Sequence, residues 1–325
     1  MRVYIVGRGA VGGYFGDILR AIGVEIEYAP RVLENVREYD ADVAIVAVKS
    51  YDTLSAIETL KAAIPFPRKC VFVCPQNGVG NEEHLIAAFG ADNVVAASLT
   101  VPVGRDRDGN AVPRKDGALA LAPTGATAFN WLVATFASTG LSVRVVEDWR
   151  ALKWSKLALN VVANASCAIL NVLPNRLVHF DRIFSLELRM LREVRAVLHA
   201  LSIAPVDLPG YSVRALLRVA MLPSPVAHGL LSSRVARGRG AKPPSLLLDL
   251  RGGKPETEVN VLNGAVAAAG LEHNVPTPVN AVYARVLDAI AHMPQLWAKY
   301  RERPETLEAE VEAEMRRTHA LARGA

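Results

Sequence analysis

The N-terminal segment is the feature that most constrains the fold of this chain. An apolar run over residues 3–6 leads directly into Gly7-Arg8-Gly9-Ala10-Val11-Gly12, and a helical pattern follows. A glycine-rich turn between a buried strand and a helix is typical of dinucleotide-binding βαβ units, in which the helix N-terminus faces a pyrophosphate. Glycines that only turn the chain are the alternative. The expected cofactor-binding residues of this turn are Gly7, Arg8, Gly9, Ala10, Val11 and Gly12.

The first half of the chain alternates short β-branched runs with helical stretches, a pattern that predicts a mostly parallel sheet with crossover helices. The expected buried strands cover residues 2–6, 24–28, 43–48, 70–74, 94–97 and 142–146. Residues 100–123 alternate around Asp108-Gly109-Asn110, which predicts an antiparallel hairpin added to the sheet edge. After Asp148, Ala, Leu, Arg and Glu recur at helical spacing. We therefore expect a Rossmann-type α/β domain over residues 1–148 and an all-α substrate and dimerisation domain over residues 149–325.

Composition excludes several classes of protein. The net charge of +5 is spread along the chain, and the densest basic stretch, residues 234–242, contains Gly but no aromatic side chain. This argues against nucleic-acid binding and fits a solvated loop or a small anionic ligand. The three cysteines, Cys70, Cys74 and Cys167, cannot all pair, and no His or Cys cluster stands near them, so neither a disulfide framework nor a metal site is expected.

The N-terminus and the hydropathy pattern bear on location. The chain begins a strand at once, without the basic segment and small-residue cleavage site of a signal peptide. No apolar run reaches the length needed to span a bilayer. A cytoplasmic protein without membrane contact is expected.

The end of the second expected strand bears on the choice of cofactor. An acidic residue at this place normally accepts the ribose hydroxyls of NAD, whereas here the chain reads Tyr28-Ala29-Pro30-Arg31. The guanidinium of Arg31 suits a 2′-phosphate, which favours NADPH over NADH. Glu27 keeps NADH as the alternative.

A polar stripe interrupts an apolar helix in the second half. Lys156, Asn160 and Asn164 recur every four positions among Leu, Val and Ala, so they are expected to share one helix face. Burial of these groups without partners would be costly, so we expect the face to line a cleft in which Lys156 acts as a general acid. In the alternative, Lys156 extends to solvent and the asparagines cap neighbouring turns. A second helix is expected to begin at residues 255–264, where ordinary capping explains the polar residues.

In these motifs the chain resembles the ketopantoate reductase family, and the resemblance covers most of its length. The segments that carry it are Gly7 to Gly12, Val48-Lys49, Gln76-Asn77-Gly78-Val79-Gly80, Trp154-Ser155-Lys156-Leu157-Ala158-Leu159-Asn160 with Asn164, Thr257-Glu258-Val259, and Leu262-Asn263-Gly264. The resemblance implies NADPH-dependent reduction of 2-dehydropantoate to pantoate in pantothenate biosynthesis, by hydride transfer to the C2 carbonyl.

The resemblance also implies roles for individual residues. Lys156 would be the proton donor, and Glu258 would lie where cofactor and substrate meet. The implied substrate-binding residues are Asn77, Asn160, Asn164, Asn175 and Ser245. The further implied cofactor-binding residues are Lys49, Asn77 and, at the 2′-phosphate, Arg31.

Two other functions remain open at this point. A related dehydrogenase for another 2-oxo acid or an opine-like substrate would share the two-domain plan. A non-enzymatic NADPH-binding sensor or scaffold would use the helical half for dimerisation. A homodimer through this half is a further expectation, based on its surplus of apolar helix.

Overall fold

The computed structural model describes residues 1–65, 69–113, 115–126, 129–239 and 242–324. The chain divides into two compact units, of which the first comprises Met1–Lys156 and Asp207–Tyr211 and the second comprises Leu157–Val206 and Ser212–Ala325. The division falls inside the helix α5 (Trp149–Val161), whereas the sequence analysis placed it between residues 148 and 149. The first turns of α5 therefore belong with the sheet.

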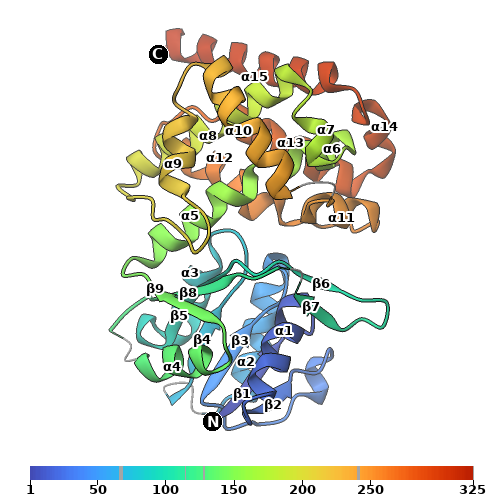
Figure 1. The fold of residues 1–325 in the computed structure, drawn as a ribbon. Coiled ribbons are helices and arrows are strands. Elements are labelled where there is room, and N and C mark those ends of the chain that lie inside the picture. The colour runs from blue at the N-terminus through green and yellow to red at the C-terminus, as the bar shows by residue number, and fades with distance from the viewer. Residues whose placement is uncertain (66–68, 114, 127–128, 240–241, 325) are drawn as a thin grey trace. The chain divides into compact units, whose positions relative to one another are not determined.

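The first unit is built on a seven-stranded sheet with the order β2-β1-β3-β4-β5-β8-β9 (Figure 1). Its strands are β1 (Arg2–Val6), β2 (Glu25–Tyr28), β3 (Val43–Val46), β4 (Val71–Cys74), β5 (Val94–Leu99), β8 (Ala118–Pro123) and β9 (Ser142–Val145). All neighbouring strands are parallel except β5 and β8. The expectation of a mostly parallel α/β sheet is confirmed, and the strand order reverses between β1 and β3, where ligands bind in such sheets.

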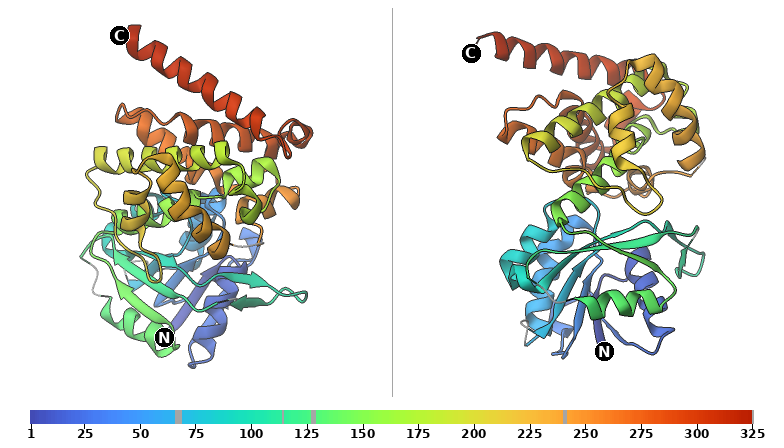
Figure 2. Two further views of the ribbon diagram at one scale, coloured as in Figure 1. Left: turned by 45° about the horizontal axis from the view of Figure 1, so that its top comes forward. Right: turned by 60° about the vertical axis from the view of Figure 1, so that its left-hand side comes forward.

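The segment between β5 and β9 differs from its prediction. Strands β6 (Val103–Arg105) and β7 (Ala111–Pro113) form a separate two-stranded sheet, so the hairpin is not added to the edge of the main sheet. Figures 1 and 2 show it reaching out beside the first helix. The following strand, β8, takes an internal place between β5 and β9. The physical reason is burial, because β8 is apolar and buried along its first five residues, whereas the residues of the short hairpin strands are half-buried or exposed.

Helices cover both faces of the main sheet. They are α1 (Ala10–Arg20) and α4 (Asn130–Ser138) on one face, and α2 (Thr53–Ala63) and α3 (Asn81–Phe89) on the other. Alternate strand residues point to opposite faces, so Ile5 packs in the apolar core under α1 and α4, and Tyr4 packs in the core under α2 and α3. In the core under α1 and α4, the rings of Phe15 and Phe136 meet edge to face with centroids 5.5 Å apart. Burial of both faces fixes the register of the strands, and the register in turn fixes where the loops at the strand ends begin.

The second unit is helical, as expected (Figure 1). After the last turn of α5 its helices are α6 (Ala165–Leu170), α7 (Pro174–Leu177), α8 (Asp181–Ala200), α9 (Val213–Val219), α10 (Ser224–Arg239), α11 (Ser245–Arg251), α12 (Asn263–Glu272), α13 (Pro278–His292), α14 (Trp297–Tyr300) and α15 (Pro304–Gly324). Figure 2 shows α15 as one long helix at the C-terminus. Among the helices that the structure describes, none combines the length and the apolar character needed to cross a membrane. Of the basic stretch at 234–242, residues 240 and 241 lie outside the described residues.

Buried polar contacts hold α8 and α13 together in this unit. The Glu193 carboxylate, on α8, accepts hydrogen bonds from the backbone N–H groups of Val279 and Asn280 at 2.9 and 3.0 Å. These two N–H groups belong to the first turn of α13 and have no partner within that helix, so the Glu193 side chain caps the N-terminus of α13. The Asn280 amide also donates to Glu193 at 2.7 Å.

Candidate active site

The glycine-rich turn joins β1 to α1. Gly7 has φ of +103°, a conformation that disfavours side chains. A Cβ at Gly12 would lie 1.9 Å from the carbonyl oxygen of Gly7, so only glycine allows the helix to approach the turn this closely. A Cβ at Gly9 would meet no described heavy atom within 4 Å. The turn is thus tightly packed at Gly7 and Gly12, whereas the space beside Gly9 is free. A ligand that binds to the backbone of the turn needs such free space.

The N-terminus of α1 leaves backbone donors at this open side. Gly9 occupies the N-cap position, and within the described residues no side chain caps the helix and no acidic residue lies in its first turn. The first N–H groups of a helix have no partner inside it, and the helix dipole adds partial positive charge there. The turn therefore fits the pyrophosphate of a dinucleotide both in shape and in charge.

Arginine side chains gather around the end of β2. The guanidinium carbons of Arg8 and Arg20 lie 4.9 and 5.1 Å from the ring centroid of Tyr28, the last residue of β2. Arg31 follows three positions later and is exposed. Arg105, on β6, donates a hydrogen bond to the carbonyl of Arg8. Neither Arg20 nor Arg105 was expected here from the sequence, and for Arg105 nothing local connects the hairpin with a turn 97 positions earlier.

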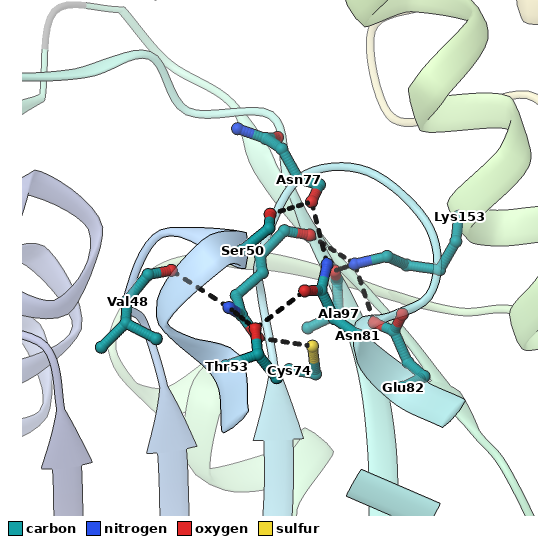
Figure 3. Close-up of polar contacts among 10 residues, drawn as sticks. Val48, Ser50, Thr53, Cys74, Asn77, Asn81, Glu82, Ala97 and Lys153 are labelled. Carbon is teal, nitrogen blue, oxygen red and sulfur yellow. Dashed lines mark hydrogen bonds and ion pairs between the residues drawn. The ribbon is translucent and has the colours of Figure 1, made fainter. Parts of the chain in front are cut away.

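Asn77 is held by its backbone in the loop that follows β4. Its carbonyl accepts hydrogen bonds from the Ser50 hydroxyl at 3.2 Å and from the Asn81 side-chain amide at 3.1 Å (Figure 3). The preceding residue, Gln76, donates from its side chain to the carbonyl of Val48 at 3.1 Å. The loops after β3 and β4 are thereby tied to each other, and Asn77 occupies a defined position at the end of β4.

Lys156 lies on α5 at the end of β5. The helix begins after Asp148, whose Oδ1 accepts the backbone N–H groups of Arg150 and Ala151 at 2.8 and 3.1 Å. The ammonium of Lys156 is partly buried and donates to the carbonyl of Leu99, the last residue of β5, at 3.0 Å. The expected proton donor is therefore directed to the carboxyl end of the sheet.

The expected residues of the first unit follow four neighbouring strands. The glycine turn follows β1, Lys49 lies shortly after β3, Asn77 follows β4, and Lys156 contacts the end of β5. These strands are parallel, so their carboxyl ends share one edge of the sheet. Neighbouring strands lie about 4.8 Å apart, which spreads the site over about 14 Å from β1 to β5. An extended ligand lying along this edge would pass all four positions.

A second lysine, Lys153, lies one turn before Lys156 and was missed by the sequence analysis. Its side chain is 1% exposed, and its ammonium lies 2.8 Å from Oε1 of Glu82, which is fully buried (Figure 3). It also donates to the carbonyls of Gln76 and, at 3.5 Å, Ala97. Burial is the largest effect and lowers the pKa of Lys153, but the Glu82 carboxylate together with Cys74 and Glu83 raises it by more, so the net shift is upward. The available signal was a lysine inside an otherwise apolar stretch.

The expected polar helix face is not continuous. Helix α5 ends at Val161, and Ala163 has φ of +47° with its N–H donating to Glu187 at 2.5 Å. Asn164 is therefore the N-cap residue of α6 and does not share a helix face with Asn160. The Asn164 amide donates to the carbonyl of Asn160 at 3.0 Å, and its Oδ1 accepts the N–H of Leu246 at 3.3 Å. These two bonds of the Asn164 side chain join the end of α5 to the start of α11, while ligand roles for Asn160 and Asn164 stay predictions.

The other expected residues of the second unit lie on several elements. Asn175 is exposed on α7, and Ser245 is exposed as the first residue of α11. Glu258 is buried and starts a 3-10 helix, Glu258–Val261, so the helix expected from residue 255 begins later, and α12 begins at Asn263. The hydroxyl of Thr257 accepts the N–H of Val259 at 3.4 Å. Capping therefore explains Thr257, while a ligand role for Glu258 stays a prediction.

The cysteines of this chain are inert thiols. Cys70, Cys74 and Cys167 are all buried as free thiols. Burial is the main cause that raises the pKa of both Cys70 and Cys74, which keeps these thiols protonated and unreactive. In the part of the chain that the structure describes, no three His, Cys, Asp or Glu side chains are grouped to hold a metal ion.

Comparisons with known proteins identify the family. Two family descriptions match, "Ketopantoate reductase PanE/ApbA" over residues 21–125 and "Ketopantoate reductase PanE/ApbA C terminal" over residues 148–291. The chain is 30% identical over 303 residues to the 2-dehydropantoate 2-reductase of Pyrobaculum aerophilum, covering 88% of this chain and 96% of that protein. The chain belongs to the ketopantoate reductase family.

Solved structures agree with this assignment. A PanE/ApbA family ketopantoate reductase from Ralstonia eutropha matches with a TM-score of 0.74 and 26% identity, over 91% of this chain and 100% of that one. D-mandelate dehydrogenase in complex with NADH and anilino(oxo)acetate also has a TM-score of 0.74, at 18% identity over 90% and 98% of the two chains. The ketopantoate reductase fold is thus shared with a protein that binds NADH and a different ligand.

Proposed function

We propose that this member of the ketopantoate reductase family reduces 2-dehydropantoate (ketopantoate) to pantoate with NADPH, with Lys156 as the proton donor. The observation that carries the proposal is the placement of the glycine turn, Lys49, Asn77 and Lys156 along one carboxyl edge of the sheet. Ligands of open α/β sheets bind at this edge. The 2-dehydropantoate 2-reductase from Pyrobaculum aerophilum, with 30% identity, supports the choice of substrate.

The residues of the site divide the work between binding and proton transfer. The backbone N–H groups of the glycine turn bind the pyrophosphate, and the bound NADPH supplies a hydride for the C2 carbonyl. Lys156, held through its contact with the Leu99 carbonyl, donates a proton to the C2 oxygen as negative charge develops there. The proposed ligand contacts outside the turn are Lys49, Asn77, Asn160, Asn164, Asn175, Ser245 and Glu258.

A substrate panel tests this proposal. Purified protein should oxidise NADPH when ketopantoate is added, with a kcat/KM at least about tenfold above the values for pyruvate and 2-oxoisovalerate, since the site must recognise the branched hydroxymethyl substrate. The measurement is the loss of absorbance of the reduced nicotinamide for each 2-oxo acid. Equal or lower kcat/KM with ketopantoate would show that the chain is a dehydrogenase for another 2-oxo acid.

The Arg31 side chain is proposed to recognise the 2′-phosphate that distinguishes NADPH from NADH. Replacing Arg31 by alanine should raise the Kd of NADPH by about tenfold to a hundredfold, because a charge-assisted bond to phosphate is lost, and should change the Kd of NADH by less than about threefold. Fluorescence titration with each nicotinamide measures both values. Arg37→Ala, at another exposed arginine of the same segment, is the matched control. An equal loss for both cofactors would mean that Arg31 does not contact the phosphate.

Two properties stay predictions beside this function. A homodimer through the helical unit would appear in light scattering as twice the mass of the 35.0 kDa chain. A cytoplasmic location is testable by cell fractionation.

A further inference from the structure

The buried pair of Lys153 and Glu82 lies directly beside the proposed site, although neither residue has a role in the proposed reaction. The Lys153 ammonium has three partners, the Glu82 carboxylate at 2.8 Å, the carbonyl of Gln76, and the carbonyl of Ala97 at 3.5 Å. These partners belong to α3, to the loop after β4, and to β5. One side chain of α5 therefore joins three elements at the carboxyl edge of the sheet (Figure 3).

The geometry connects Lys153 with two of the expected ligand contacts of this edge, Lys156 and Asn77. Lys153 binds the carbonyl of Ala97 and Lys156 binds the carbonyl of Leu99, so two lysines one helical turn apart contact β5 two residues apart. Both carbonyls lie past Ala96, which pairs with the last residue of β4. The third partner, the Gln76 carbonyl, immediately precedes Asn77.

Stability alone gives no reason for an ion pair at this place. Removing two charges from water is costly, and well-packed apolar side chains of similar volume often stabilise a protein equally well or better. Both Lys153 and Glu82 are almost completely buried, at 1% and 0% exposure, so they carry this cost in full. What an apolar pair cannot supply is directional bonding to the carbonyls of Gln76 and Ala97.

From these contacts we infer that the Lys153–Glu82 pair is a positioning element, which holds α5 in register on β5 and thereby places the Lys156 ammonium and Asn77. The inference rests on the proposed function, since it assigns the pair to the reaction that Lys156 serves. Lys153 and Glu82 touch neither substrate nor cofactor in this account. Glu82 fixes the ammonium of Lys153, and Lys153 fixes the loop and the strand.

The first test is Glu82→Gln, which keeps the shape of the side chain and removes its charge. The kcat for ketopantoate should fall about tenfold to a hundredfold, because displacements of about 1 Å in a catalytic group have effects of this size. The KM for NADPH should change by less than about threefold, because the glycine turn is untouched. A solely structural pair would lower the melting temperature and leave kcat per folded molecule unchanged, and that result would overturn the inference.

A double variant keeps the test decisive if Glu82→Gln does not fold. Glu82→Leu combined with Lys153→Met leaves no charge stranded in the interior, so the protein should fold. The bonds to the Gln76 and Ala97 carbonyls are nevertheless lost, so kcat should stay at least about tenfold below wild type. A folded double variant with wild-type kcat would overturn the inference.

The control and the order of measurement separate the two proposals. Lys61→Met removes an exposed lysine that pairs with Glu58 at 2.9 Å on α2, in the same unit, and should leave kcat unchanged. Wild-type turnover with ketopantoate is measured first. Its absence would refute the proposed function, whereas an active wild type with equally active pair variants would refute only the positioning role.

Discussion

Replacing Lys156 by alanine is expected to lower kcat for ketopantoate reduction by about 10²- to 10⁴-fold, the range that general acid catalysis contributes. The ammonium is directed to the end of β5, and a methyl group there cannot protonate the forming alkoxide. NADPH should still bind, because the glycine turn lies three strands away at β1. Steady-state kinetics and a fluorescence titration of NADPH measure the two effects separately.

The control for this experiment is Lys61→Ala, which removes an exposed lysine on α2 and should leave kcat unchanged. Unchanged turnover in Lys156→Ala would show that another group donates the proton. A wild-type protein that binds NADPH but reduces no 2-oxo acid would favour the alternative of a non-enzymatic sensor. Because cofactor binding is recorded for each protein, a misfolded variant is not mistaken for an inactive one.

Two glycine substitutions in the turn are expected to have different effects. Gly12→Ala places a Cβ 1.9 Å from the Gly7 carbonyl oxygen, so α1 must move away from the turn. Overpacking of this kind costs about 1–3 kcal/mol, and NADPH binding should be lost together with stability. Gly9→Ala introduces a Cβ that meets no described atom within 4 Å, at a φ of −77° that alanine readily adopts. Its melting temperature should therefore match wild type.

Gly9→Ala should affect cofactor binding although it leaves stability unchanged. If the pyrophosphate lies against Gly9, the added methyl group should raise the Kd of NADPH by at least about tenfold, the effect of about 1.4 kcal/mol. Thermal melts and fluorescence titrations of both variants give the comparison. Normal NADPH affinity in Gly9→Ala would place the dinucleotide elsewhere.

The sheet could be predicted where the local pattern is strong. Strand β1, the turn and α1 follow from short-range periodicity and from glycine chemistry, and the structure agrees with them. The hairpin and β8 were placed incorrectly because the identity of their partner strands depends on contacts far along the chain. Burial, which decides that β8 lies inside the sheet, is a tertiary property that alternation over residues 100–123 does not reveal.

The candidate site shows the same limit. Lys156 could be singled out as a polar residue on an apolar helix, but the same reasoning extended the helix to Asn164. The break at Ala163 depends on a hydrogen bond to Glu187, which is 24 positions away. Lys153 was overlooked because its partner Glu82 lies on α3, and no spacing rule connects the two. The two lysines of α5 are therefore distinguished by their partners in other elements: Lys153 pairs with Glu82 in the interior, whereas Lys156 contacts the Leu99 carbonyl at the sheet edge.

The central claim is that the dinucleotide at the glycine turn and Lys156 at the end of β5 serve one reaction at C2 of ketopantoate. The most direct measurement follows the hydride itself, using NADPH with deuterium at both hydrogen positions of nicotinamide C4 and mass spectrometry of the product. We expect pantoate that carries one deuterium at C2, formed rapidly by wild type and at least about a hundredfold more slowly by Lys156→Ala. Pantoate without deuterium, or no pantoate from the wild-type protein, would contradict it.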